Sequence, residues 1–288
     1  MLWLSFSLLF LFVSTLTASI ESAPLSEIRG SRTNYIKETS PIDCAKVPPT
    51  FWCVNEKLTK ECGFDKLCDG YSKATKNQKL QLTIFYESLC PDCQEFMTND
   101  FYRNVYLKFG DFIKFELVPY GNAKNDDGKI KCQHGEKECA INKYHSCVLH
   151  YMPEPIPFIV CMEARIQDGS TMDKAAEKCY YTFHVQPHVA DQIIHCANGD
   201  IGDKFQQDAA KRTAEAFPDQ HKHVPWILFN NVSIESQQFL ISDLPVAICE
   251  FYNGDRQPGN CKGLGSSSRT LNGCAKGYFL DEEDDFEA

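Results

Sequence analysis

Apolar and polar residues alternate over residues 80–86 (LQLTIFY), a pattern that predicts a largely buried strand. From residue 94 to 108 the apolar residues recur every four positions, so Met97, Phe101 and Val105 share one face of a helix that Gly110 ends. Residues 112–118 are rich in β-branched and aromatic residues and predict a second strand. A helix crosses between the two strands, so we expect them to be parallel.

The turn between the first strand and the helix carries the chemistry. Cys90 and Cys93 form a Cys-x-x-Cys pair at the predicted helix start. Unpaired backbone N–H groups and the helix dipole stabilise a thiolate there, so Cys90 is expected to attack a disulfide and Cys93 to resolve the intermediate. Strand, Cys-x-x-Cys, helix and strand are the order in which a thioredoxin-like fold begins. A structural disulfide or half of a zinc site is the alternative, although the chain has no second Cys-x-x-Cys.

A long interruption follows, at about residues 120–217. Helical patterns near 170–181, 189–196 and 204–217 predict a helical insertion stapled by disulfides. Its cysteines are Cys132, Cys139, Cys147, Cys161, Cys179 and Cys196. A metal site formed by His134, His145 and nearby cysteines is an alternative for residues 132–147. In an oxidising compartment we expect disulfides instead, and neither a metal nor a cofactor.

The core resumes at residues 223–230 (HVPWILFN), where a proline precedes an apolar strand. We expect the Val224–Pro225 bond to be cis and to face the Cys-x-x-Cys turn, where backbone groups can bind a substrate strand. Asn231 begins a glycosylation sequon. Residues 239–252 predict a closing helix, stapled by Cys249 and Cys261, and Cys274 is left over in a Gly- and Ser-rich tail.

A small cysteine cluster precedes the main domain. Cys44, Cys53, Cys62 and Cys68 lie within 25 residues, a segment too small to fold on its apolar surface alone. With Trp52 and Gly63, their pattern resembles a saposin A-type domain over residues 41–72; a generic two-disulfide knot is the alternative.

Fifteen cysteines in 288 residues imply structural disulfides and a secretory, lumenal or lysosomal compartment. Residues 2–16 are apolar apart from Ser and Thr, so residues 1–19 predict a cleaved signal peptide, followed by a polar linker at 20–40. No other segment is expected to span a membrane. The net charge is −10, and the tail, 262–288, ends in a run of carboxylates. An acidic chain without a basic patch argues against nucleic acid as a partner.

Three features together resemble the gamma-interferon-inducible lysosomal thiol reductase family over residues 79–261: the Cys-x-x-Cys after residues 86–89 (YESL), the block at 132–147, and the element at 224–226 (VPW). The resemblance implies a thioredoxin-like α/β reductase domain in a glycoprotein of endosomes and lysosomes, or secreted. Cys90 and Cys93 would be its redox pair, unfolded proteins that contain disulfides its substrates, and a small thiol its reductant.

Low pH limits thiol–disulfide exchange, because the attacking group is a thiolate. A thiol with a pKa of about 8.5 is ionised in about one molecule in 3,000 at pH ~5, so Cys90 needs a lowered pKa, which an ionised Asp92 would oppose. A disulfide isomerase or oxidase remains an alternative, because direction depends on the reduction potential. A disulfide-rich binding protein with an inert Cys90–Cys93 bridge is another.

Overall fold

The computed structural model describes residues 43–47, 49–53, 56–262 and 264, all within one compact unit. The expected signal peptide, the linker, most of the tail and Cys274 lie outside the described residues. Within the described part of the chain, no helix combines the length and the apolar character that a membrane crossing needs.

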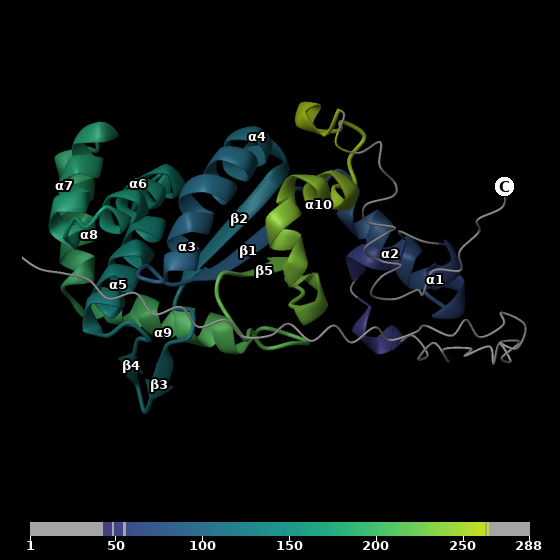
Figure 1. The fold of residues 1–288 in the computed structure, drawn as a ribbon, viewed down its shortest axis with the longest axis horizontal. Coiled ribbons are helices and arrows are strands. Elements are labelled where there is room, and N and C mark those ends of the chain that lie inside the picture. Colours follow the sequence, from purple (N-terminus) through teal and green to yellow (C-terminus); the bar gives the residue numbers. More distant parts are fainter. Residues whose placement is uncertain (1–42, 48, 54–55, 263, 265–288) are drawn as a thin grey trace, which may run out of the picture. The chain divides into compact units, whose positions relative to one another are not determined.

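A three-stranded sheet forms the centre, in the order β2-β1-β5 (Figure 1). β1 (Leu80–Tyr86) pairs with β2 (Ile113–Pro119) in parallel, as predicted, and with β5 (Trp226–Phe229) antiparallel. Every residue of β1 except Gln81 is buried, because the strand is central and covered on both faces. Because β1 is the central strand, its C-terminal end lies between the end of β2 and the start of β5.

One continuous helical segment joins β1 to β2. It starts as α3 (Pro91–Glu95), widens to a π-helical stretch, η3 (Phe96–Tyr106), and ends as α4 (Leu107–Phe109) and a 3₁₀ turn, η4 (Gly110–Phe112). The predicted apolar face is buried, from Met97 to Phe109. An apolar repeat of four residues is longer than the 3.6-residue α-turn, and the wider π-turn keeps that row facing the sheet.

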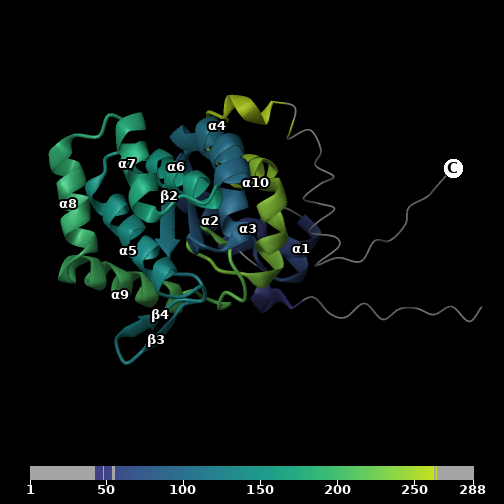
Figure 2. The same ribbon diagram turned by 60° about the vertical axis from the view of Figure 1, so that its left-hand side comes forward.

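Five helices and a hairpin make up the insertion. The hairpin is β3 (Lys124–Asp126) with β4 (Lys129–Lys131), and it projects away from the helices (Figure 2). The helices are α5 (Glu136–Tyr151), α6 (Pro155–Gln167), α7 (Met172–Thr182), α8 (Pro187–Ala197) and α9 (Asp200–Ala214). The last three match the predicted helical patterns, with α9 beginning and ending earlier than expected. The sequence patterns did not predict α5 and α6: α5 buries polar residues among its apolar ones and so lacks a clean apolar stripe.

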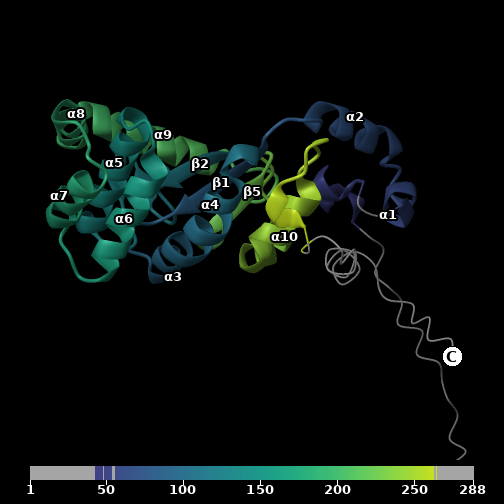
Figure 3. The ribbon, with the colours of Figure 1, turned by 90° about the horizontal axis from the view of Figure 1, so that it is seen from above.

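The insertion is stapled as expected. Disulfides join Cys132 to Cys139, Cys147 to Cys196, and Cys161 to Cys179. Figures 1 and 3 show α5 to α9 gathered at one end of the sheet.

The N-terminal cysteine cluster folds as short helices at the other end of the sheet (Figure 3). These are η1 (Cys44–Lys46), η2 (Pro49–Phe51), α1 (Glu56–Glu61) and α2 (Asp65–Thr75), held by the disulfides Cys44–Cys62 and Cys53–Cys68. The cluster packs on the main domain, since Phe51 meets Phe251 edge to face, with ring centroids 5.4 Å apart, and Tyr71 accepts a hydrogen bond from Asn230.

The predicted closing helix is divided in two. A 3₁₀ stretch, η5 (Glu235–Asp243), precedes α10 (Leu244–Phe251), because Pro245 has no backbone N–H for the carbonyl four residues earlier and its ring clashes with that carbonyl, so one continuous α-helix cannot form. The expected pair, Cys249 and Cys261, joins α10 to a final turn, η6 (Gly259–Cys261).

Candidate active site

Cys90 and Cys93 lie where β1 gives way to α3. Cys90 is the residue that precedes the helix, with extended backbone at φ −73° and ψ 120°, and Pro91 occupies the first turn. Both thiols are free, whereas the other twelve described cysteines are all in disulfides. Cys90 is 8 % exposed and Cys93 is fully buried. Cys90 is therefore the thiol nearer to solvent.

The two thiols have opposite electrostatic surroundings. The Cys93 thiol donates a hydrogen bond to Cys90, and the backbone N–H groups of Cys93 and Asp92 add to it, so the pKa of Cys90 falls from 9.0 to about 6. Burial opposes this shift, and so does the charge of Asp92, as the sequence suggested. Burial raises the pKa of Cys93 far above its usual range. At mildly acidic pH Cys90 is thus the ionisable sulfur and Cys93 a proton donor.

The segment before β5 faces these sulfurs. The Val224–Pro225 bond is cis, as predicted, and the Val224 carbonyl oxygen lies 3.9 Å from Cys90 Sγ. β5 is anchored behind it: Trp226 Nε1 donates to Ser233 Oγ at 2.9 Å, and the buried Gln238 side chain bonds both the N–H and the carbonyl of Ile227. Residues 134 positions apart in the chain thus meet at the thiol.

Helix α5 holds the turn that leads to Cys90. The Asn142 side chain accepts a hydrogen bond from Ser88 N at 3.0 Å, and Glu138 Oε2 accepts one from Leu89 N at 3.3 Å. Gln94 Nε2 adds a bond to the Ser88 carbonyl at 2.8 Å. The block at 132–147 is conspicuous in the sequence, but its pattern did not predict this role. The four-residue spacing of Glu138 and Asn142, which places both on one helix face, is the signal that would have indicated it.

Glu138 also belongs to a cluster with Glu87 and His134. His134 Nδ1 lies 2.6 Å from Glu138 Oε2 and 3.6 Å from Glu87 Oε2, and one potential ligand atom from each residue falls within 4.8 Å of the others. This is not the metal set considered from the sequence. The cysteines of that set are in disulfides, and His145 instead faces Tyr86.

A second buried polar group lies nearby. Tyr86 Oη is 3.1 Å from His145 Nδ1, which is 3.6 Å from Glu163 Oε1, and all three side chains are fully buried. Burial lowers the pKa of His145 to about 3 and raises those of Glu163 and Tyr86. At mildly acidic pH these groups are therefore uncharged, which reduces the cost of burying them.

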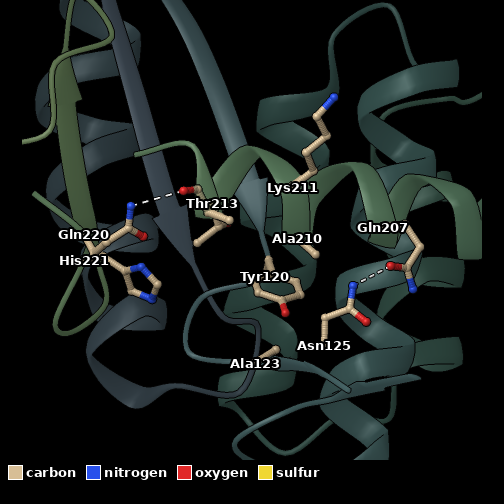
Figure 4. A pocket seen from close by; sticks show the side chains of 10 residues that line it. Tyr120, Ala123, Asn125, Gln207, Ala210, Lys211, Thr213, Gln220 and His221 are labelled. Carbon is tan, nitrogen blue, oxygen red and sulfur yellow. Dashed lines mark hydrogen bonds between the residues drawn. The ribbon is translucent and has the colours of Figure 1, made fainter. Parts of the chain in front are cut away.

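A pocket of about 480 Å³ opens between α9 and the segment that follows β2 (Figure 4). Tyr120, just after β2, and His221, ahead of the cis proline, lie on its wall, and an Asn125–Gln207 hydrogen bond of 2.6 Å crosses one side. The backbone N–H of Tyr120 also donates to the carbonyl of Tyr86 at 3.0 Å. One wall of the pocket is thus hydrogen-bonded to the last residue of β1, but neither Cys90 nor Cys93 lines the pocket.

Sheet order, a Cys-x-x-Cys pair at a helix N-terminus and a cis proline opposite it define a thioredoxin-like thiol–disulfide oxidoreductase. Comparison with known proteins names the family. Residues 81–183 match the family described as gamma interferon inducible lysosomal thiol reductase. The chain belongs to this family.

Two relatives show the extent of the likeness. A gamma-interferon-inducible lysosomal thiol reductase of Carassius auratus is 33 % identical over 239 residues, which cover 81 % of this chain and 90 % of that protein. The protein of the same name from Mus musculus is 32 % identical over 199 residues, which cover 67 % of this chain and 75 % of that protein. Among solved structures, the oxidoreductase DsbA of Xylella fastidiosa aligns with a TM-score of 0.40 and 15 % identity, over 60 % of this chain and 86 % of that one.

Proposed function

We propose that this protein reduces disulfide bonds of unfolded proteins in an acidic endosomal or lysosomal compartment, with Cys90 as nucleophile and Cys93 as resolving thiol. The observation that carries the proposal is the free Cys90 thiol at the start of α3, whose pKa lies near 6. At pH ~5 a thiol with that pKa is ionised in about one molecule in ten, several hundred times more than an ordinary cysteine. Population then outweighs the lower intrinsic nucleophilicity of such a thiolate.

The reaction proceeds in two exchanges. The Cys90 thiolate attacks one sulfur of the substrate disulfide, forms a mixed disulfide and releases the other substrate sulfur. Cys93 then loses its proton and attacks Cys90 Sγ, which releases the second substrate sulfur and leaves a Cys90–Cys93 disulfide. Two electrons pass from the protein to the substrate, and a small thiol restores the pair. The backbone around Val224 and Pro225 is proposed to bind the extended substrate segment.

The pKa of Cys90 also bears on direction, the point on which an oxidase or isomerase would differ. A lowered thiolate pKa stabilises the reduced protein above that pKa and so favours oxidation of substrates. This stabilisation is lost as the pH falls through about 6. At acidic pH the reduced pair is therefore a better reductant of substrate disulfides, which supports a reductase in an acidic compartment and leaves isomerase activity as the second candidate at neutral pH.

Asn231 supports a passage through the secretory pathway. Asn230 and Asn231 form a tight turn after β5 with φ angles of 47° and 65°, and Asn231 is exposed. We propose that it carries an N-linked glycan. Loss of a mass shift on glycosidase treatment after Asn231→Gln would support this assignment.

Reduction of insulin disulfides by the full chain, followed at pH ~5 and pH ~7 with a small thiol as reductant, tests the proposed function. We expect turnover above the uncatalysed thiol rate at both pH values, with the larger ratio at pH ~5. Cys90→Ser is the matched control and should give the uncatalysed rate. A wild-type protein no faster than Cys90→Ser would instead support the inert disulfide-rich binding protein.

A further inference from the structure

Glu87 is a buried carboxyl group that the two-step exchange leaves without a role. It follows β1 directly and its side chain is fully buried. Asn122 N donates to Oε1 at 2.5 Å, and the side chain fills the space above Gly121, where a Cβ would lie 2.3 Å from Glu87 Cγ. Oε2, however, has no hydrogen-bond partner. A buried oxygen left unpaired is costly, so its retention calls for an explanation other than stability.

His134 connects this carboxyl group to solvent. Its side chain is 32 % exposed and its Nδ1 lies between Glu138 Oε2 and Glu87 Oε2, at 2.6 Å and 3.6 Å. Both oxygens of Glu138 already accept hydrogen bonds, from His134 N and Leu89 N among others. A cation would have to displace these donors, so the arrangement favours groups that share protons rather than a metal site.

The cluster also adjoins the thiols. The Glu87 backbone N–H donates a hydrogen bond to the Cys93 sulfur, and the Glu87 carboxylate interacts electrostatically with both Cys90 and Cys93. In the reduced protein the Cys93 thiol donates a hydrogen bond to the Cys90 thiolate. Once Cys90 is joined to substrate it carries no charge and cannot take up the Cys93 proton. Because Cys93 is fully buried, the resolving step needs another base close to it.

We propose that Glu87 accepts the proton of Cys93 when Cys93 resolves the mixed disulfide, and that His134 passes this proton to solvent. The inference rests on the proposed reductase function. As the Cys93 S–H bond breaks, the proton moves to Glu87 Oε2 and the sulfur electron pair forms the bond to Cys90 Sγ. The bond between Cys90 and the substrate sulfur breaks, and that sulfur leaves with its electron pair. Cys93 and Cys90 are oxidised together and the substrate is reduced.

The charges around Glu87 suit this timing. Burial, then the Glu138 carboxylate and the Cys90 thiolate, raise the pKa of Glu87 to about 7, while Asn122 N–H and His134 lower it. In the mixed disulfide the Cys90 charge is gone, so one of the contributions that raise this pKa disappears. Glu87 therefore ionises more readily at this step, and because its pKa lies near 7, the fraction of molecules in which it can accept the proton rises with pH up to that value.

Single-turnover kinetics with Glu87→Gln tests the proposal, with Glu95→Gln, an exposed carboxyl group on α3, as the matched control. The pre-reduced full chain is mixed with a disulfide-containing peptide, quenched with acid and analysed by mass spectrometry for the Cys90–peptide adduct. We expect the adduct of Glu87→Gln to decay about 10-fold or more slowly than that of wild type and to lose the wild-type rise in rate with pH. Glu95→Gln should match wild type.

Alkylation of Cys90 at pH ~8, where its thiolate is fully formed, separates this role from a structural one. Glu87→Gln should alkylate within about twofold of wild type. If adduct decay keeps the wild-type rate and pH profile, or if alkylation slows as much as decay, the proposal is overturned. A wild-type protein that forms no adduct contradicts the proposed function instead.

His134→Ala gives an independent test. It should slow adduct decay less than Glu87→Gln, and imidazole added to the buffer should restore most of the rate, because His134 is partly exposed. A slowed His134→Ala variant that imidazole does not restore, or an unslowed one, would overturn the assignment of His134.

Discussion

Two cysteine pairs near helix N-termini have opposite states in this molecule. Cys90 and Cys93 flank the start of α3 and are free, whereas Cys132 and Cys139 flank the start of α5 and form a disulfide. In the free pair, Cys90 faces the Val224 carbonyl and accepts hydrogen bonds from backbone N–H groups. The bonded pair closes a short loop at the start of α5. Position at a helix start is thus not enough for redox chemistry. The groups that face the sulfur decide its role.

The largest expected effect comes from removing the free pair. Cys90→Ser should abolish reductase activity, because the remaining free thiol, Cys93, is fully buried and has a raised pKa. Cys93→Ser should leave an attacking thiol that cannot resolve, so mixed disulfides accumulate on Cys90. Non-reducing gels and peptide mass spectrometry would measure both. Residual turnover in Cys90→Ser would assign the nucleophile elsewhere.

Removing the bonded pairs should cost more stability the longer the loop that each one closes, because the entropic term grows with the logarithm of loop length. For Cys147 and Cys196, 49 residues apart, loop-closure entropy predicts about 4 kcal/mol; for Cys132 and Cys139, seven apart, about 2 kcal/mol. Double Ser variants and urea unfolding would measure the difference. The Cys132/Cys139 variant should also slow Cys90 alkylation, because that bridge holds the turn next to Glu138. Equal alkylation in both variants would contradict this link.

The hydrogen bond from the Ser88 N–H to Asn142 of α5 can be tested separately from the disulfides. Asn142→Ala leaves the buried Ser88 N–H without its acceptor, which we expect to cost about 1–3 kcal/mol. Alkylation of Cys90 in the folded variant should slow because the turn loosens. Thr182→Ala, on exposed α7 surface, is the control. A variant that loses stability while its Cys90 is alkylated at the wild-type rate would contradict a role of this hydrogen bond in positioning Cys90.

The smallest expected effect concerns Asp92. Cys90 alkylation should rise with pH to a plateau, with a midpoint near 6, because only the thiolate reacts. Asp92 raises the Cys90 pKa, so Asp92→Asn should move the midpoint to lower pH by a fraction of a pH unit, measured by thiolate absorbance. A midpoint that moves upward would mean that Asp92 acts by another route. In linkage terms, the lowered pKa stabilises the reduced fold above the unfolded value of 9.0, and this contribution fades as the pH falls through about 6.

Local patterns predicted elements whose burial follows a simple period. The alternation in β1, the apolar face from Met97 to Phe109 and the three later helices of the insertion appear in the structure. α5 was missed because it turns Glu138, Asn142 and His145 inward, so polar residues interrupt its apolar face. The split between η5 and α10 follows Pro245, because a proline cannot make the α-helical hydrogen bond to the carbonyl four residues earlier.

The sequence alone determined that the Cys90–Cys93 pair lies at a helix start, with the strand and helix around it, and it led to the expectation of an oxidising compartment, since these depend on residues close together in the chain or on composition. The tertiary structure decided which cysteines pair, how α5 holds the turn before Cys90, and that Glu87, His134 and Glu138 meet there. These depend on contacts between distant segments, and their free energies of burial and hydrogen bonding exist only once the segments are packed together.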